Sequence, residues 1–391
     1  MKLYLKKGRE DSIKRYHPWI FSGAIKYIDA ANTEEGGVVE IYSSHGEFLG
    51  RGHYQTGSIS VRILTFEDEN IDGQFFKNRI SEAYSLRKKI GLINNPNITA
   101  YRLVHGEGDR LSGLVIDVYG DTAVFQAHSV GMWKSKEIIT EALTSVCKDI
   151  KHVYSKSLNA LQQPELCADD CWLSEKREMP ITVNEHGNLF EINPEEGQKT
   201  GFYIDQRENR LLVQKYSRNA SVLNLFSYTG AFSVYAIRGG AVKTVSVDSS
   251  QKAIDMANKN VELNFGNSVN HLGKTEDIFT FLRESDEKFD LIILDPPAFA
   301  KHHSALKNAL NSYKRLNVRA MEKLNSGGIL FTFSCSQAVS EIQFLQTVFS
   351  AAAITGRKAS ILHCLNQPED HPVNIYHPEG KYLKGLALYL L

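Results

Sequence analysis

From about residue 195 onward, apolar segments typical of β-strands alternate with segments of helical spacing. The strand candidates are 222–226, 243–247, 289–294 and 328–334, and the helix candidates are 230–238, 250–264, 304–325 and 337–353. This alternation predicts an α/β domain whose parallel sheet carries helices on both faces. A ligand crevice is then expected beyond the carboxyl ends of its first strands.

The chain before this region has a different pattern and predicts two further domains. Residues 1–72 contain short strand-like segments separated by turns, which predicts a small β-barrel. Residues 73–190 combine helical spacing with two hairpin signals, which predicts an α+β domain. A length of 391 residues has room for two or three domains, so we expect boundaries at 1–72, 73–190 and 191–391.

The composition excludes several classes of protein. Hydrophobic residues make up 42% and charged residues 23%, as in ordinary globular proteins, and no apolar run is long enough to cross a membrane. The N-terminal segment lacks the apolar core of a signal peptide, and five scattered cysteines suit a reducing cytoplasm. Cys167 and Cys171 have no second matching pair, so no metal site is expected.

Two segments of the α/β region are candidates for cofactor binding. The first strand, with Asn224, runs into the turn Phe226-Ser227-Tyr228-Thr229-Gly230, which lacks the glycine pattern that binds a pyrophosphate. Asp248 ends the next strand, where a carboxylate can bind a ribose diol, although capping of the next helix is an equal alternative. Together these features favour S-adenosylmethionine over NAD.

A further carboxylate, Asp277, follows at the start of another helical segment. Its carboxylate is placed to accept a hydrogen bond from the adenine amino group of a bound cofactor. The alternative is that it stabilises the positive end of the helix dipole, and this explanation comes first for the residue taken alone.

Two residues at the ends of later strands are candidates for catalysis. Asp295 follows a buried strand and precedes Pro296-Pro297, a stiff turn that would hold the carboxylate outward. Cys335 follows the next strand, so both side chains are expected at one edge of the sheet. A thiolate that adds to C6 of a pyrimidine makes C5 nucleophilic enough to accept a methyl group, while an acid absorbs charge at N3.

The sequence resembles the PUA-domain-containing family of large-subunit ribosomal RNA cytosine-5 methyltransferases. The segments that carry the resemblance are HPWIFSGAI at 17–25, EGDRLSGLVID at 107–117 and EGQKTGFYIDQRENR at 196–210. The resemblance implies an N-terminal PUA-like barrel, a central α+β domain and a C-terminal Rossmann-like class I methyltransferase domain. It also implies formation of 5-methylcytosine in 23S ribosomal RNA with S-adenosylmethionine as cofactor.

The resemblance and the strand-end positions together define the predicted site. Cys335 is the expected nucleophile and Asp295 its partner. The residues expected to bind the cofactor are Phe202, Tyr203, Asp205, Arg207, Asn224, Phe226, Tyr228, Gly230, Asp248, Asp277 and Asp295.

Several alternatives stay open at this stage. A single cysteine is also the arrangement of uracil-5 methyltransferases. Adenine amino-group methyltransferases carry an aromatic residue directly after the Pro-Pro pair, whereas here Ala298 precedes Phe299. A catalytically inactive RNA-binding protein is a further alternative. We interpret Trp19 and Phe21 as barrel core rather than as base-stacking residues.

The formal net charge of zero hides two basic segments. Residues 1–26 hold seven basic and two acidic residues, and residues 301–323 hold six basic residues and one acidic residue. The second segment follows the Pro-Pro turn, and its Lys301, Arg315 and Arg319 are predicted to contact RNA phosphates. We therefore expect ribosomal RNA as the partner, no membrane and a cytoplasmic location, and we leave a homodimer open.

Overall fold

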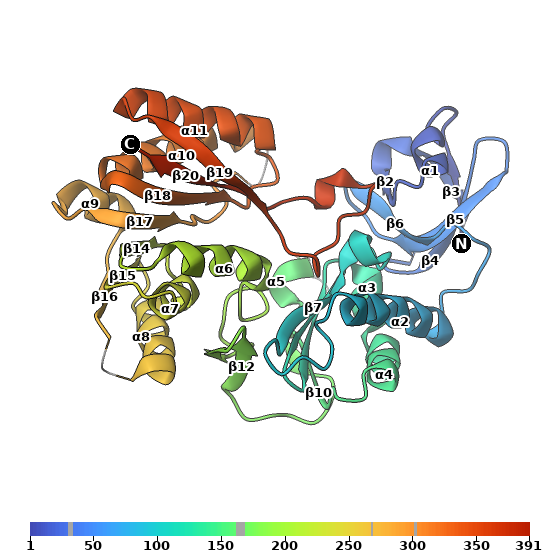
Figure 1. Cartoon of the computed structure of the whole chain (residues 1–391). Helices are drawn as coiled ribbons and strands as arrows, with labels where there is room; N and C mark the ends of the chain where they lie inside the picture. Colours follow the sequence, from blue (N-terminus) through green and yellow to red (C-terminus); the bar gives the residue numbers. More distant parts are fainter. Residues whose placement is uncertain (30–33, 162–168, 267–268, 301–302) are drawn as a thin grey trace. The chain divides into compact units, whose positions relative to one another are not determined.

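The computed structural model describes residues 1–29, 34–161, 169–266, 269–300 and 303–391, which form two compact units (Figure 1). The first unit consists of Met1–Asn184, Ile192–Ile204 and Glu369–Gly380. The second consists of Glu185–Glu191, Asp205–Pro368 and Lys381–Leu391. Within the described ranges, every helix is too short or too polar to span a bilayer.

The N-terminal part of the first unit is a six-stranded sheet in the order β2-β6-β5-β4-β1-β3. Its elements are β1 (Lys2–Leu5), α1 (Asp11–Lys14), β2 (Trp19–Phe21), η1 (Ser22–Ala24), β3 (Ile25–Asp29), β4 (Val38–Tyr42), β5 (Phe48–Tyr54) and β6 (Ile59–Thr65). Alternate side chains such as Leu3, Ile41 and Val61 point into one apolar core, as the period-2 pattern predicts.

The rest of the first unit packs helices against a five-stranded sheet in the order β11-β10-β9-β8-β7. Its elements are α2 (Gly73–Lys89), β7 (Ala100–His105), η2 (Gly106–Asp109), β8 (Leu114–Tyr119), β9 (Thr122–Ala127), α3 (Val130–Lys134), α4 (Lys136–Val146), β10 (His152–Ser155), α5 (Leu158–Leu161) and β11 (Cys171–Trp172). The predicted hairpins are present as β8–β9 and as β12 (Ile181–Glu185) with β13 (Asn188–Ile192).

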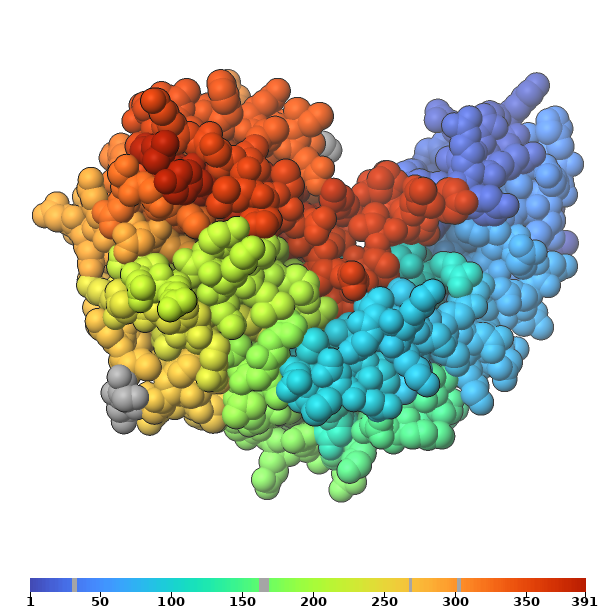
Figure 2. All heavy atoms as spheres, in the orientation of Figure 1, coloured from blue at the N-terminus to red at the C-terminus, as the bar shows by residue number. Residues whose placement is uncertain are grey.

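The segment Glu369–Gly380, which includes η6 (Pro378–Gly380), belongs to the first unit. In the sequence it comes between β19 and β20, which are strands of the second unit. The guanidinium of Arg87, which is fully buried, pairs with Asp109 and donates to the Asp370 carbonyl at 2.7 Å. Asn374 donates to the Glu107 carbonyl at 3.1 Å. In Figure 2 this red-orange segment lies against the blue N-terminal part of the chain.

The second unit contains a seven-stranded sheet in the order β16-β15-β14-β17-β18-β20-β19. Its elements are η4 (Ile204–Gln206), α6 (Arg207–Tyr216), β14 (Ser221–Leu225), α7 (Ala231–Arg238), β15 (Lys243–Asp248), α8 (Gln251–Phe265), β16 (His271–Thr275), α9 (Ile278–Glu284), β17 (Phe289–Leu294), η5 (His303–Ala305), α10 (Leu306–Glu322), β18 (Leu324–Ser334), α11 (Glu341–Thr355), β19 (Ala359–Asn366) and β20 (Lys384–Leu390).

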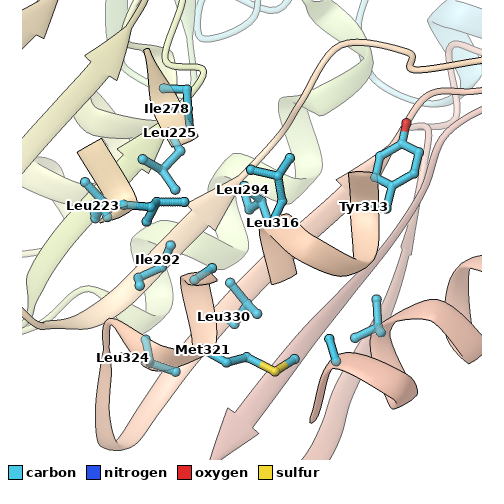
Figure 3. Close-up of a cluster of buried hydrophobic side chains, with 14 of the residues drawn as sticks. Leu223, Leu225, Ile278, Ile292, Leu294, Tyr313, Leu316, Met321, Leu324 and Leu330 are labelled. Atoms are coloured by element: carbon cyan, nitrogen blue, oxygen red, sulfur yellow. The ribbon is translucent and has the colours of Figure 1, made fainter. Parts of the chain in front are cut away.

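Strand residues of this sheet alternate between two apolar cores, one on each face. On β17, Ile292 and Leu294 join the core with α9, α10 and α11 (Figure 3). Leu291 and Ile293 join the core with α6 and α7. This arrangement confirms the predicted helices on both faces. The sheet is not wholly parallel, because β20 runs antiparallel to both β18 and β19.

Within the second unit, a buried ion pair joins Glu185, the first residue of the segment Glu185–Glu191, to α6. Glu185 is fully buried and Arg210 is 1% exposed. Two guanidinium nitrogens of Arg210 donate to the two carboxylate oxygens of Glu185, both at 2.7 Å, and the Tyr235 hydroxyl donates to the same carboxylate at 2.9 Å. Such bidentate pairing offsets the cost of burying both charges.

Replacing Arg210 by methionine leaves the Glu185 charge buried without its cation. We expect the free energy of unfolding to fall by about 3–5 kcal/mol, measured by urea denaturation followed by circular dichroism. Arg283→Met is the matched control because it breaks the exposed pair with Glu284, and it should cost less than about 1 kcal/mol. Equal losses in the two variants would contradict the assigned role of the buried pair.

Candidate cofactor and catalytic site

The predicted site residues of the second unit follow neighbouring parallel strands. In the register of the sheet, Leu225 pairs with both Val247 and Leu294, and Leu294 pairs with Thr332. Parallel strands end at the same edge of a sheet. The residues that the structure brings to this edge are Phe226, Tyr228, Gly230, Asp248, Asp277, Asp295 and Cys335.

The turn after β14 has an uncommon backbone. Phe226, Tyr228 and Gly230 have positive φ angles of 58°, 44° and 72°. For the two aromatic residues this left-handed conformation costs about 1–2 kcal/mol each. A Cβ at Gly230 would lie 2.7 Å from the Cβ of Ala257, so the turn can approach α8 only with glycine there. Strain of this kind is typical of ligand-binding loops.

Asp248 holds this turn in place. Its Oδ2 accepts a hydrogen bond from the Tyr228 N–H at 3.0 Å, and its Oδ1 accepts one from the Ser250 N–H at 3.0 Å. The N-cap of α8 is Ser250, not Asp248. The carboxylate therefore connects the ends of β14 and β15 while remaining partly exposed at the sheet edge.

Asp277 and Asn224 take part in local structure. Asp277 is exposed and caps α9, with Oδ1 accepting from the Thr280 N–H at 2.9 Å, as the alternative explanation predicted. Asn224 is 1% exposed, and its amide donates to Ser233 at 3.0 Å within a buried network that continues to Ser246. The Asn224 side chain thus lies within the fold rather than at the open edge.

Asp295 accepts a hydrogen bond from a residue that sequence reasoning missed. The Gln206 amide donates to Asp295 Oδ2 at 3.0 Å, and the Asn209 amide donates to Gln206 Oε1 at 2.6 Å. Both amides are buried, with exposures of 2% and 3%. The signal was present in the segment at 196–210, where Gln206 lies between two residues that were named.

The remaining residues of that segment divide between the two units. In the second unit, Asp205 accepts from the Tyr382 hydroxyl at 2.7 Å and Arg207 pairs with Glu208 at 3.0 Å. In the first unit, Phe202 is buried, and the Tyr203 hydroxyl donates to Gln198 at 2.8 Å. The cofactor contacts expected of Phe202, Tyr203, Asp205 and Arg207 stay predictions.

Cys335 is partly exposed and begins a loop that is joined to the Pro-Pro loop. The Ser336 hydroxyl donates to the Ala300 carbonyl at 2.5 Å, and Ser336 is fully buried. The Lys384 ammonium donates to the carbonyls of Ser336 and Val339 in this loop, both at 2.7 Å. Sequence reasoning missed Lys384 because it begins an otherwise apolar strand.

Two of the predicted RNA contacts lie on the exposed side of α10. Arg315 is exposed and its guanidinium lies 5.4 Å from the centre of the Phe279 ring. Arg319 is 52% exposed and pairs with Glu322 at 2.8 Å. The third, Lys301, lies outside the described residues.

The first unit carries an aromatic surface that corrects one interpretation. Phe21 is 51% exposed and Trp19 is partly exposed, whereas Ile20 between them is 1% exposed. The core interpretation of Phe21 is therefore wrong, because alternation along β2 turns Ile20 inward and its neighbours outward. Trp19 instead contacts the His377 ring, with 4.3 Å between ring centres, and Tyr16 contacts Tyr376 at 5.2 Å.

The same surface brings together three side chains that could ligate a metal. Among the described residues, His17, His377 and Glu379 offer ligand atoms within 4.8 Å of one another. Each imidazole is 3.9 Å from the Glu379 carboxylate, which is 57% exposed. We assign no metal to this group, and the expectation of no metal site stays a prediction.

Comparisons with known proteins match both ends of the chain. A family model described as S-adenosylmethionine-dependent methyltransferase matches residues 135–386, and one described as PUA-like domain matches residues 3–66. A candidate S-adenosylmethionine-dependent methyltransferase from Streptococcus mutans superposes with a TM-score of 0.86 at 24% identity, covering 100% of both chains. These matches confirm the predicted architecture, a PUA-like barrel, a central domain and a C-terminal Rossmann-like sheet.

Curated relatives match over nearly the whole length. The ribosomal RNA large subunit methyltransferase I of Aeromonas salmonicida is 41% identical over 393 residues, which cover 99% of this chain and 98% of that protein. The protein of the same name from Vibrio cholerae is 38% identical over 397 residues, covering 100% and 99%. The chain therefore belongs to the ribosomal RNA large subunit methyltransferase I family, and it is a methyltransferase that uses S-adenosylmethionine as its cofactor.

Proposed function

We propose that this enzyme forms 5-methylcytosine in large-subunit (23S) ribosomal RNA, with Cys335 as the nucleophile. The names of its relatives support the class of RNA. The observation that carries the cytosine-5 chemistry is the pairing of two loops. Asp295 follows β17, Cys335 follows the adjacent parallel strand β18, and the Ser336–Ala300 hydrogen bond joins the loops directly after them.

The proposed reaction assigns one role to each of these side chains. S-adenosylmethionine supplies an electrophilic methyl group. The Cys335 thiolate adds to C6 of a cytosine that has left its stack, and C5 thereby becomes nucleophilic. Asp295, as the protonated carboxylic acid, donates its proton to N3 and so neutralises the negative charge that develops there. After methyl transfer, loss of the C5 proton to a base lets the Cys335–C6 bond break.

We assign the cofactor to the sheet edge around the turn after β14. Asp248 presents a partly exposed carboxylate at the end of β15, where it can accept hydrogen bonds from a ribose diol. The left-handed backbone at Phe226 and Tyr228 shapes this turn, and the missing side chain at Gly230 lets the turn pack closely on α8. One carboxylate oxygen of Asp277 caps α9, and the other can accept a hydrogen bond from the adenine amino group.

Two surfaces are suited to the RNA. Arg315 and Arg319 are exposed on α10, which follows the Pro-Pro loop, and their charges can pair with phosphates. The first unit offers half-exposed aromatic rings at Tyr16 and Phe21 of the barrel and at Tyr376 of the segment Glu369–Gly380, and such rings stack with unpaired bases.

The alternatives are less well supported. An inactive RNA-binding protein is set aside because the chain is a methyltransferase. Phe299, the aromatic residue near the Pro-Pro pair, packs on Tyr313 with 4.8 Å between ring centres, which leaves it poorly suited to stack on a flipped adenine. A uracil-5 reaction uses the same thiol chemistry, and nucleoside analysis of the product distinguishes it from the cytosine-5 reaction.

We also propose the three-domain division at 1–72, 73–190 and 191–391. The strand β6 ends at Thr65 and α2 begins at Gly73, while the hairpin β12–β13 ends at Ile192. The location of ribosomal RNA supports a cytoplasmic enzyme. The homodimer stays a prediction.

Replacing Cys335 by alanine tests the nucleophile. We expect the variant to lose methylation by at least about 1000-fold, and to form no denaturation-stable adduct with RNA that contains 5-fluorocytosine, because the C6–sulfur bond cannot form. Calorimetry should show unchanged binding of S-adenosylmethionine. Cys364→Ala is the control, since Cys364 is exposed on β19, and it should behave as wild type. Retained methylation of cytosine by Cys335→Ala would refute the mechanism.

Charge reversal at Arg315 or Arg319 tests the RNA surface. We expect weaker RNA binding, measured by filter binding at several salt concentrations. The slope of the logarithm of the binding constant against the logarithm of the salt concentration should become shallower by about one for each arginine. The affinity for S-adenosylmethionine should not change. Arg283→Glu on α9, also exposed, is the control for general charge effects. Equal weakening by all three variants would argue against a specific contact on α10.

A further inference from the structure

Lys384 is a buried cation at the catalytic edge of the sheet. It is the first residue of β20, and the antiparallel register pairs it with Ser334, the last residue of β18. An antiparallel strand begins where its parallel neighbours end, so Lys384 lies beside the loop that starts at Cys335. Its exposure is only 5%.

The contacts of this lysine go to the backbone of the cysteine loop. Its Nζ donates to the Ser336 carbonyl and to the Val339 carbonyl, both at 2.7 Å. The Val339 N–H in turn donates to the Ser336 carbonyl at 3.2 Å. Because Ser336 also bonds the Pro-Pro loop through Ala300, the Cys335 loop is held both by Lys384 and by the loop that follows Asp295.

Burying an ammonium between carbonyls is costly when no carboxylate is bonded to it. In the described part of the chain, the nearby Glu341 carboxylate is paired with Lys381 at 2.5 Å, and both side chains are exposed. Burial lowers the pKa of Lys384 to about 8, while Cys335 and Glu341 act in the opposite direction and Lys381 adds to the lowering. The ammonium therefore predominates below pH 8 and is lost above it.

The other acidic groups near this loop are the Asp295 carboxyl, which accepts from the Gln206 amide, and the Tyr313 phenol. Burial raises the pKa of the Tyr313 phenol to about 12, so this group is neutral at physiological pH. The thiol of Cys335 is then the group whose ionisation Lys384 can favour. A cation near a cysteine lowers the pKa of the thiol and increases the fraction of reactive thiolate.

We propose that Lys384 is a positioning residue for Cys335: it fixes the loop Cys335–Val339 through two carbonyls, and its charge stabilises the thiolate. The proposal rests on the proposed function, in which Cys335 is the nucleophile. It adds a residue from the C-terminal strand to the catalytic machinery and gives a reason for a lysine in an apolar strand.

The test is the pH dependence of alkylation at Cys335. Iodoacetamide is reacted with the full-length enzyme at a series of pH values, and modification of the peptide that contains Cys335 is followed by mass spectrometry. In Lys384→Met we expect the midpoint of the curve of alkylation rate against pH to rise by about one pH unit. The rate of Cys335 alkylation at pH 7 should fall about tenfold. Lys384→Arg should restore most of the rate, because it retains the charge.

The control is Lys358→Met, which removes an exposed lysine at the opposite end of β20 and should leave the profile unchanged. Methyl transfer provides a second readout, in which Lys384→Met lowers kcat while the KM for S-adenosylmethionine stays the same. An equal loss in Lys384→Met and Lys384→Arg would indicate a purely structural role and would overturn the proposal.

The outcomes separate this inference from the proposed function. If Cys335→Ala still methylates cytosine, the nucleophile assignment fails and Lys384 loses its role with it. If Cys335→Ala is inactive but Lys384→Met has the wild-type alkylation profile, only the inference about Lys384 fails. Should Lys384→Met not fold, the wild-type profile decides, because a midpoint at or above about 8.5, the value of an ordinary thiol, contradicts the proposal.

Discussion

The parallel register of β14, β15, β17 and β18 is the constraint on which the site depends. Hydrogen bonding between these strands aligns Leu225 with Val247 and Leu294, and Leu294 with Thr332. The residues that follow the carboxyl ends of these strands therefore lie at the same edge of the sheet. A shift of one residue would exchange the two faces and move the apolar side chains of β17 out of their cores. Core packing and site geometry are thus set by the same register.

A second set of interactions joins the loops at this edge. Gln206 reaches Asp295 from the start of α6, Ser336 connects the cysteine loop to the Pro-Pro loop, and Lys384 braces the same loop from β20. All three side chains are buried, so their hydrogen bonds form in a medium where an unmade bond is costly. Such bonds restrict the positions that Asp295 and Cys335 can take, which is the preorganisation that a catalytic site needs.

Much of this architecture could be predicted from local patterns. The strand β17 was located within its observed bounds, and β14, β15 and the main helices within a few residues, because buried parallel strands are continuous apolar runs. The edge strands β16 and β19 were missed because their outward side chains are exposed and break the pattern. Asp295 and Cys335 could be named because each follows a strand directly. Gln206 and Lys384 could not, since a single sequence does not show which distant loop a buried polar side chain reaches.

The sequence by itself determined the fold class, the family and the order of functional residues along the chain, because periodicity and short motifs are properties of neighbouring residues. Only the tertiary structure decided the partners of these residues. It turned Phe21 outward, drew Asn224 into a buried network, placed the segment Glu369–Gly380 in the first unit and brought Lys384 beside the Cys335 loop. The physical reason is that a hydrogen bond or a buried charge depends on proximity in space, and this proximity is set by the packing of strands that are far apart in the chain.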